Sequence, residues 1–170
     1  MKKQYKLIGV LLFFTLGFLA CKRQLDLQPL GELTDETFYQ TEADFDAASL
    51  SPYATLLDFY WDQTGSPWYV PNLYPDDDVT VNSNQSNDVE DFNWLPSNGN
   101  FLTVWQTCYK GIQRANVVLA QLPRAKGFQD ESAKPRYEAE ARFMRAYFNF
   151  ILATYWGTPP IADSSITSIE

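Results

Sequence analysis

Two stretches decide the fold: FLTVWQTCYKGIQRANVVLAQL at 101–122 and YEAEARFMRAYFNFILATYWG at 137–157. In the first, one stripe of residues recurs every three or four positions, the spacing of one face of an α-helix; the stripe comprises Phe101, Trp105, Cys108, Tyr109, Ile112, Asn116 and Leu119. At 1.5 Å per residue this helix is roughly 33 Å long. Pro123 ends it, because proline interrupts a helix interior.

The second stretch predicts another long helix, with Pro135 in its first turn and Gly157 as its C-cap. Its main stripe comprises Tyr137, Ala141, Met144, Phe148, Ile151, Leu152 and Tyr155. A second stripe of Phe143, Tyr147 and Phe150 makes its later half apolar almost all round, which predicts a helix sandwiched between neighbours. Two long helices joined by a short link pack as an antiparallel hairpin, the unit of a helical solenoid.

Upstream, a third helical segment is expected within residues 42–62. Thr41 is a suitable N-cap, and Asp44 three residues later approximates a capping box. Pro52 lies inside the segment and is expected to kink or break the helix at Ser51.

Residues 63–100 differ in character, because they are rich in proline, glycine and asparagine and show no sustained period. They predict a long surface excursion, and long loops in compact domains are often functional. Aromatic rings with polar edges suit the flat apolar faces of sugars. We therefore take Trp68, Tyr69, Tyr74 and Trp94 as candidate ligand-binding residues, with Trp61 as a further aromatic nearby. The alternative is that these rings pin the loop to the helical core.

Several other polar or reactive residues are expected to stabilise the fold rather than to bind a ligand. Asn116 is expected to form a hydrogen bond to a neighbouring helix, as a buried amide requires. Arg142, four residues after Glu138, forms a favourable helix pair, and Arg145 is a second structural clamp. Cys108 lies on an apolar stripe and is expected to be buried.

The three consecutive acids Asp76, Asp77 and Asp78 lack an ordered ligand spacing. They indicate a solvated loop rather than a calcium site, so we expect no metal. The chain has no histidine, which removes the commonest general base and metal ligand. Serine-hydrolase, metal-site and phosphate-loop motifs are also missing from the sequence. We therefore expect a binding protein without a cofactor, not an enzyme.

The first 20 residues have the features of a secretory signal peptide. Lys2, Lys3 and Lys6 precede an uncharged stretch from Leu7 to Ala20, which is too short for the roughly 20 residues of a membrane span. Cys21 follows directly, as in lipoprotein signals, and is the expected lipid attachment site. The domains expected are a signal peptide at 1–20, a lipidated tether at 21–33 and a helical body at 34–170.

Removing the leader leaves 10 basic against 21 acidic residues, a net charge of −11. Such a surface repels phosphates, so nucleic acid is not an expected partner. The tail after the last helix, GTPPIADSSITSIE, adds no closing element, which predicts that the helical body is the N-terminal portion of a larger fold.

Four segments, in order, resemble the SusD/RagB family of Bacteroidetes nutrient-binding lipoproteins. They are CKRQLDLQPLGELTDETFYQTEADFDAA at 21–48, YATL at 53–56, WQTCYKGIQRANVVL at 105–119 and EARFMRAYFNFILATYWGTPPI at 140–161. The first resembles a family opening of the form "LD…P…FY.TE.D", and the last two resemble "W…Y..I..AN..L" and "EA.FLRA..YF.L...YG..P". The ordered set covers most of the chain after Cys21.

This resemblance implies a mainly α-helical protein of tetratricopeptide-like hairpins on the outer membrane. It implies a SusC-type TonB-dependent transporter as partner and a glycan or peptide as ligand, which the lipoprotein captures for import. Family members are several times longer than this chain. The alternative is a lipid-anchored helical scaffold of the cell envelope that binds no nutrient, and an envelope hydrolase ranks last.

Overall fold

The computed structural model describes residues 38–61, 67–80 and 87–165. All of them belong to one compact unit, Asp35–Glu170. The expected signal peptide, the lipid attachment site Cys21 and the tether at 21–33 lie outside the described residues, so these three assignments stay predictions.

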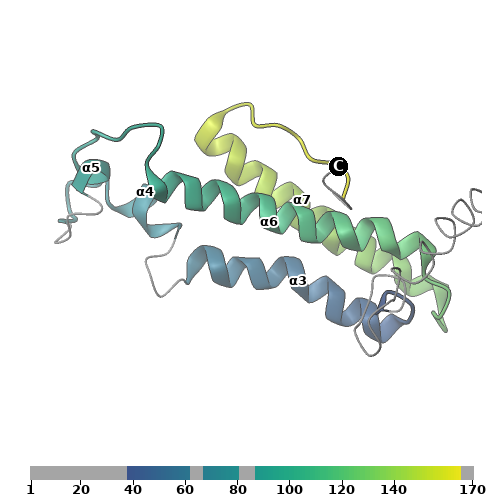
Figure 1. Ribbon diagram of the computed structural model, residues 1–170. Coiled ribbons are helices and arrows are strands. Elements are labelled where there is room, and N and C mark those ends of the chain that lie inside the picture. The colour runs from purple at the N-terminus through teal and green to yellow at the C-terminus, as the bar shows by residue number, and fades with distance from the viewer. Residues whose placement is uncertain (1–37, 62–66, 81–86, 166–170) are drawn as a thin grey trace, which may run out of the picture. The chain divides into compact units, whose positions relative to one another are not determined.

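The described part of the chain is mainly helical and contains no β-strand, which confirms the expected fold class. Three long helices form its body (Figure 1): α3 (Glu42–Tyr60), α6 (Gly99–Gln121) and α7 (Lys134–Trp156). Two short helices, α4 (Tyr69–Leu73) and α5 (Asn87–Glu90), lie in the excursion between α3 and α6. Two 3-10 turns, η2 (Leu122–Arg124) and η3 (Glu131–Ala133), link α6 to α7.

The ends of α6 and α7 follow from local chemistry. The Asn98 side chain caps α6 by accepting a hydrogen bond of 2.9 Å from the backbone N–H of Asn100. Pro135 occupies the first turn of α7. Gly157 ends α7 with φ of 72°, a left-handed conformation that glycine adopts without steric cost. These boundaries confirm the sequence-based helices within about two residues.

The three long helices pack in alternating directions. Asn116 bonds Arg145 and Gly111 abuts Phe148, so residue numbers rise along α6 as they fall along α7. This confirms the antiparallel hairpin. Lys110 pairs with Asp58 at 2.7 Å and Arg114 bonds Thr55 at 2.9 Å, so α3 is also antiparallel to α6. Consequently α3 and α7 run parallel to each other.

The start of α3 forms the expected capping box. The backbone N–H of Asp44 donates to the Thr41 hydroxyl, and the Thr41 N–H donates to the Asp44 carboxylate at 2.7 Å. The Thr41 hydroxyl and the Thr41 backbone N–H both donate to this carboxylate, and they hold the pKa of Asp44 below its ordinary value. The expected break at Ser51 does not occur, because α3 continues through a buried Pro52. Arg114 of α6 donates to the Ser51 carbonyl and the Thr55 hydroxyl, which secures the helix at this point.

The core comprises two clusters along the helices. One joins the start of α3 to the α6–α7 link, and its buried residues are Phe45, Ala48, Val118, Leu122, Ala125, Phe128, Tyr137 and Ala141. The other joins the end of α3 to the middle of the hairpin, through Phe59, Val104, Cys108, Ile112, Met144, Phe148, Ile151 and Leu152. The main apolar stripes predicted for α6 and α7 supply most of the second cluster, but only Tyr137 and Ala141 of the first.

The prediction that α7 is sandwiched between neighbours is wrong for the described residues. Phe143 and Phe150, from its second stripe, are 63% and 69% exposed. Helices α3 and α6 contact α7 on the side of its main stripe, and nothing in the described ranges covers the opposite side. Leu50 and Leu57 of α3 are similarly exposed, at 63% and 66%.

The segment after α7 folds back over the hairpin. Asn116 donates to the carbonyls of Ala162 and Ser164 at 3.0 and 3.1 Å, and accepts from Arg145 at 3.1 Å. Arg145 also donates to the Asp163 carbonyl. These bonds confirm the structural roles predicted for Asn116 and Arg145. The expected pair of Arg142 and Glu138 is present at 2.7 Å.

Candidate functional site

The short helix α4 organises the candidate site. The Trp68 backbone N–H donates to the Phe59 carbonyl at 3.2 Å, which fixes the start of α4 to the end of α3. Val70 is buried and α4 contacts α6. Since residues four apart share a helix face, Trp68 and Asn72 lie on one side of α4, and Pro71 lies on another.

A first hollow of about 300 Å³ lies between α3, α4 and α7, and we call it the tyrosine hollow. Its lining includes Tyr60, Trp68, Asn72, Tyr147 and Tyr155. The hydroxyls of Tyr60 and Tyr147 share a hydrogen bond, and the Asn72 amide donates to the Tyr155 hydroxyl. Burial and the bond to Tyr60 raise the pKa of Tyr147 to about 12, so this phenol stays neutral at physiological pH.

A second hollow of about 350 Å³, the tryptophan hollow, lies at the meeting of α4, the start of α6 and the end of α7. Its lining residues are Pro71, Pro75, Trp94, Leu95, Pro96, Phe101, Tyr155 and Trp156. The Trp94 ring centroid lies 5.4 Å from that of Phe101 and 5.7 Å from that of Phe92. Aromatic residues and prolines therefore make up most of the lining of this hollow.

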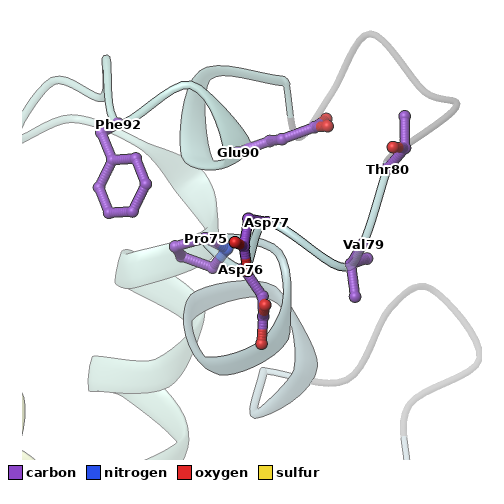
Figure 2. A pocket seen from close by; sticks show the side chains of 7 residues that line it. All are labelled: Pro75, Asp76, Asp77, Val79, Thr80, Glu90 and Phe92. Atoms are coloured by element: carbon purple, nitrogen blue, oxygen red, sulfur yellow. The ribbon is translucent and has the colours of Figure 1, made fainter.

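A third hollow of about 540 Å³, the acidic hollow, lies beyond the end of α4 (Figure 2). Its lining residues are Pro75, Asp76, Asp77, Val79, Thr80, Glu90 and Phe92. In Figure 2 the Phe92 ring and the stretch from Val79 to Thr80 lie on opposite sides of Pro75 and the two aspartates. Carboxylates accept hydrogen bonds only, so this hollow suits a ligand rich in donors such as hydroxyls.

The acidic run Asp76–Asp78 is exposed, as the sequence predicts. One carboxylate oxygen from each of the three residues lies within 4.8 Å of the other two. Asp76 is also engaged locally, because its Oδ1 accepts a hydrogen bond of 3.1 Å from the Asp78 backbone N–H. This bond shapes the turn that forms one wall of the acidic hollow.

The four candidate aromatic residues occupy different places. Trp68 lines the tyrosine hollow and Trp94 lines the tryptophan hollow. Tyr69 is 40% exposed with its ring centroid 5.5 Å from that of Trp68, but it does not line these hollows. Tyr74 is half-buried and lines none of them either. The structure therefore brings Trp68 and Tyr69 together and leaves Trp94 on the far side of α4.

Sequence reasoning missed five residues that shape the hollows: Tyr60, Asn72, Phe92, Tyr147 and Tyr155. Tyr147 and Tyr155 belong to the apolar stripes predicted for α7, and Tyr60 falls in the helical segment expected within residues 42–62. Periodicity identifies a helix face but not what covers it. The spacing of Phe92 and Trp94, two positions apart in a polar loop, was the one signal that could have added Phe92.

Cys108 is fully buried, as predicted. Burial raises the pKa of its thiol to about 12. A thiol needs its thiolate form to act as a nucleophile, so Cys108 is an inert core residue at neutral pH.

Comparison with protein families decides where the chain belongs. A SusD-like family with the description "Starch-binding associating with outer membrane" matches residues 34–169. The chain belongs to this SusD-like family. The match confirms the resemblance that the four sequence segments indicate, and the family description names binding at the outer membrane.

Two curated SusD-like relatives come from Formosa agariphila. SusD-like protein P38 is 26% identical over 94% of this chain, and SusD-like protein P2 is 26% identical over 97%. The matched regions are 31% and 32% of those proteins, so this SusD-like chain spans about a third of their length. No solved structure matches the chain.

None of the described helices combines the length and the apolar character needed to cross a bilayer.

Proposed function

We propose that this SusD-like chain captures a nutrient, a glycan or a peptide, at the outer membrane for a SusC-type TonB-dependent transporter. The observation that carries the proposal is the group of three hollows around α4, which combine aromatic rings with hydrogen-bonding groups. Family membership supports the same reading, since the matching family is described as starch-binding. Of the two ligand classes, the hollows favour the glycan.

The chemistry of the hollows suits sugars in two respects. Sugars present apolar C–H faces that pack on aromatic rings, and their hydroxyls need donors and acceptors at the ring edges. Trp94 and Trp156 offer such rings in the tryptophan hollow, while Asp77 and Glu90 offer acceptors in the acidic hollow. The volumes, about 300–540 Å³, lie in the range of small-molecule sites.

Attachment to the membrane is assigned to Cys21. An acyl chain contributes roughly 0.8 kcal/mol per buried CH₂, and two or three chains give a lasting anchor. The surface charge, net −8 for the whole chain, would not attract an anionic membrane by itself. Replacing Cys21 by serine should release the protein into the soluble fraction, and mass spectrometry should detect diacylglycerol only on the unchanged chain.

Docking on the transporter is assigned to the helical body. The exposed apolar side chains of α3 and α7, including Leu57 and Phe143, provide surface for such a contact. Co-purification after mild solubilisation tests this part of the proposal. Recovery of the protein from its native envelope without any TonB-dependent transporter would contradict the docking role.

Glycan binding is tested by a matched pair of tryptophan variants. Trp94→Ala removes a ring that lines the tryptophan hollow, whereas Trp61→Ala removes a 75% exposed ring that lines none of the three hollows. Loss of an aromatic contact worth about 0.5–1.5 kcal/mol predicts a two- to tenfold weaker glycan affinity for Trp94→Ala. Trp61→Ala should bind normally. If the unchanged protein binds no member of a panel of glycans and peptides, that result would favour the scaffold alternative.

A further inference from the structure

We infer that the three hollows are successive subsites for one extended ligand, a linear glycan without acidic groups. This inference rests on the proposed function and adds the length and charge of the ligand. It starts from the way in which the hollows adjoin one another.

Shared walls join the hollows into a row. Pro75 lines both the acidic and the tryptophan hollow, and Tyr155 lines both the tryptophan and the tyrosine hollow. Across the first junction, Phe92 of the acidic hollow packs against Trp94 of the tryptophan hollow at 5.7 Å between ring centroids. The order along the row is therefore acidic, tryptophan, tyrosine.

The helix α4 explains why the row is continuous. Trp68 and Asn72 face the tyrosine hollow, Pro71 faces the tryptophan hollow, and Pro75 follows at the start of the acidic hollow. The segment 68–75, which contains α4, thus contributes to all three walls. A ligand that passes from one hollow to the next follows this element instead of crossing separate domains.

The same pair of chemical features repeats in each hollow. The tyrosine hollow combines the Trp68 ring with phenol hydroxyls, and the tryptophan hollow combines the Trp94 ring with Tyr155. The acidic hollow combines the Phe92 ring with carboxylates. A repeated pairing of ring and polar group matches a ligand that repeats one unit, as a linear glycan does.

The charges along the row select against acidic ligands. The acidic hollow carries Asp76, Asp77 and Glu90, and among the residues that the structure describes no lysine or arginine lines any of the three hollows. A uronate or sulfate group would meet like charges without a compensating cation, which disfavours binding. Uncharged hydroxyls, in contrast, can donate to these carboxylates.

Chain-length dependence tests the row directly. The full chain, in a detergent without sugar headgroups, is titrated calorimetrically with malto- and cello-oligosaccharides of two to seven units and with oligogalacturonides of matched length. We expect affinity in at least one neutral series to rise at least tenfold from two to seven units. Oligogalacturonides should bind at least tenfold more weakly than the neutral chains.

A variant in the middle of the row sharpens the test. Trp94→Ala interrupts the central hollow, so it should abolish most of the gain in affinity with chain length while a two-unit ligand binds nearly as before. Trp61→Ala is the control and should leave the length dependence unchanged. Circular dichroism of both variants checks that they fold.

Each other result overturns a specific statement. Binding that does not depend on length would refute the row and leave the proposed function standing. Equal or tighter binding of oligogalacturonides would refute the selection against acidic groups. Failure of every neutral and acidic glycan to bind would refute both the row and the glycan reading of the proposed function.

Discussion

The helical body (α3, α6 and α7) and the excursion (residues 61–98) use the same aromatic residue types in opposite ways. In the body, Phe45, Tyr137 and Phe148 are fully buried between helices. In the excursion, Phe92 is 67% exposed and Trp94 is 39% exposed, although their rings contact each other. A ring therefore becomes core where its helix face packs against another helix. Away from such a packed face, the ring stays partly exposed, as Phe92 and Trp94 do beside the hollows.

Polar groups show the same division. In the body, polar side chains mostly bond to one another and so stabilise the fold. Tyr137, for example, donates to Asp46 at 2.7 Å, and Arg136 pairs with the same carboxylate at 2.8 Å. In the excursion, Asp77 and Glu90 border open space in the acidic hollow. Stability should therefore depend on the body and ligand affinity on the excursion, and substitutions in the two regions test this division.

The largest contrast is expected between Phe148→Ala and Trp94→Ala. Removing the fully buried Phe148 ring leaves a cavity and should lower the free energy of unfolding by about 3–5 kcal/mol. Trp94→Ala should cost only about 1 kcal/mol, because its ring is partly solvated and packs on few partners. Urea denaturation followed by circular dichroism measures both. Equal losses would contradict the division between body and excursion.

A pair of glycine substitutions measures how tightly the body is packed. A Cβ at Gly111 would lie 2.2–2.6 Å from the Phe148 ring, so Gly111→Ala should destabilise by about 1–3 kcal/mol. A Cβ at Gly99, at the boundary with the excursion, would have nothing within 4 Å. Gly99→Ala is the matched control and should be neutral or gain about 0.4–1 kcal/mol. A neutral Gly111→Ala would mean that the ring moves freely.

Alkaline pH should destabilise the body through the buried Cys108 thiol and the half-buried Tyr147 phenol. Burial raises the pKa of Cys108 from 9.0 to about 12, and the pKa of Tyr147 is raised from 10.0 to about 12. Between pH 9 and 12 the unfolded chain releases these protons while the folded chain retains them, so stability falls as pH rises. For Cys108 the slope approaches about 1.4 kcal/mol per pH unit within this window.

Replacement of the thiol separates the two contributions. Cys108→Ala should flatten the alkaline slope between pH 9 and 10, where Tyr147 contributes little. It also creates a small cavity, so the slope and not the absolute stability is compared. An unchanged slope in denaturation curves recorded at pH 8, 9 and 10 would show that the thiol is not held in its neutral form.

The smallest effect is expected at the junction between excursion and body. Asn98 caps α6 and also donates to the Asp88 carboxylate, so Asn98→Ala should cost about 1 kcal/mol. Asn98→Asp keeps the cap but sets two carboxylates side by side. It should therefore preserve α6 while it loosens the excursion, which hydrogen exchange of residues 87–98 would detect. If exchange of residues 87–98 in Asn98→Asp equals that of the unchanged protein, the bond to Asp88 is unimportant.

Much of the helical body was predictable because its signals are local. Thr41 with Asp44, Pro135 and Gly157 mark helix ends by hydrogen bonds and backbone angles that neighbouring residues determine. The exceptions have tertiary causes. Pro52 does not break α3; it is buried in the folded chain, and Arg114 of α6 donates to the adjacent Ser51 carbonyl. Phe143 and Phe150 are exposed, because periodicity cannot say how many neighbours a helix has.

The candidate site was predictable only in part. A loop rich in aromatic residues indicated the excursion, and Trp68 and Trp94 do line hollows there. The residues that complete those hollows come from distant parts of the chain. Tyr155 of α7, for example, meets Asn72 of α4 from 83 positions away.

Residue order alone predicted the three long helices, most of their ends, the burial of Cys108 and membership of the SusD-like family, because each depends on local periodicity, capping or ordered motifs. Helix packing determines which rings face solvent. It also places Pro75 between the acidic and tryptophan hollows and Tyr155 between the tryptophan and tyrosine hollows. The physical reason is that a hollow is the space left between elements. It therefore depends on how helices pack, which no local pattern of residues specifies.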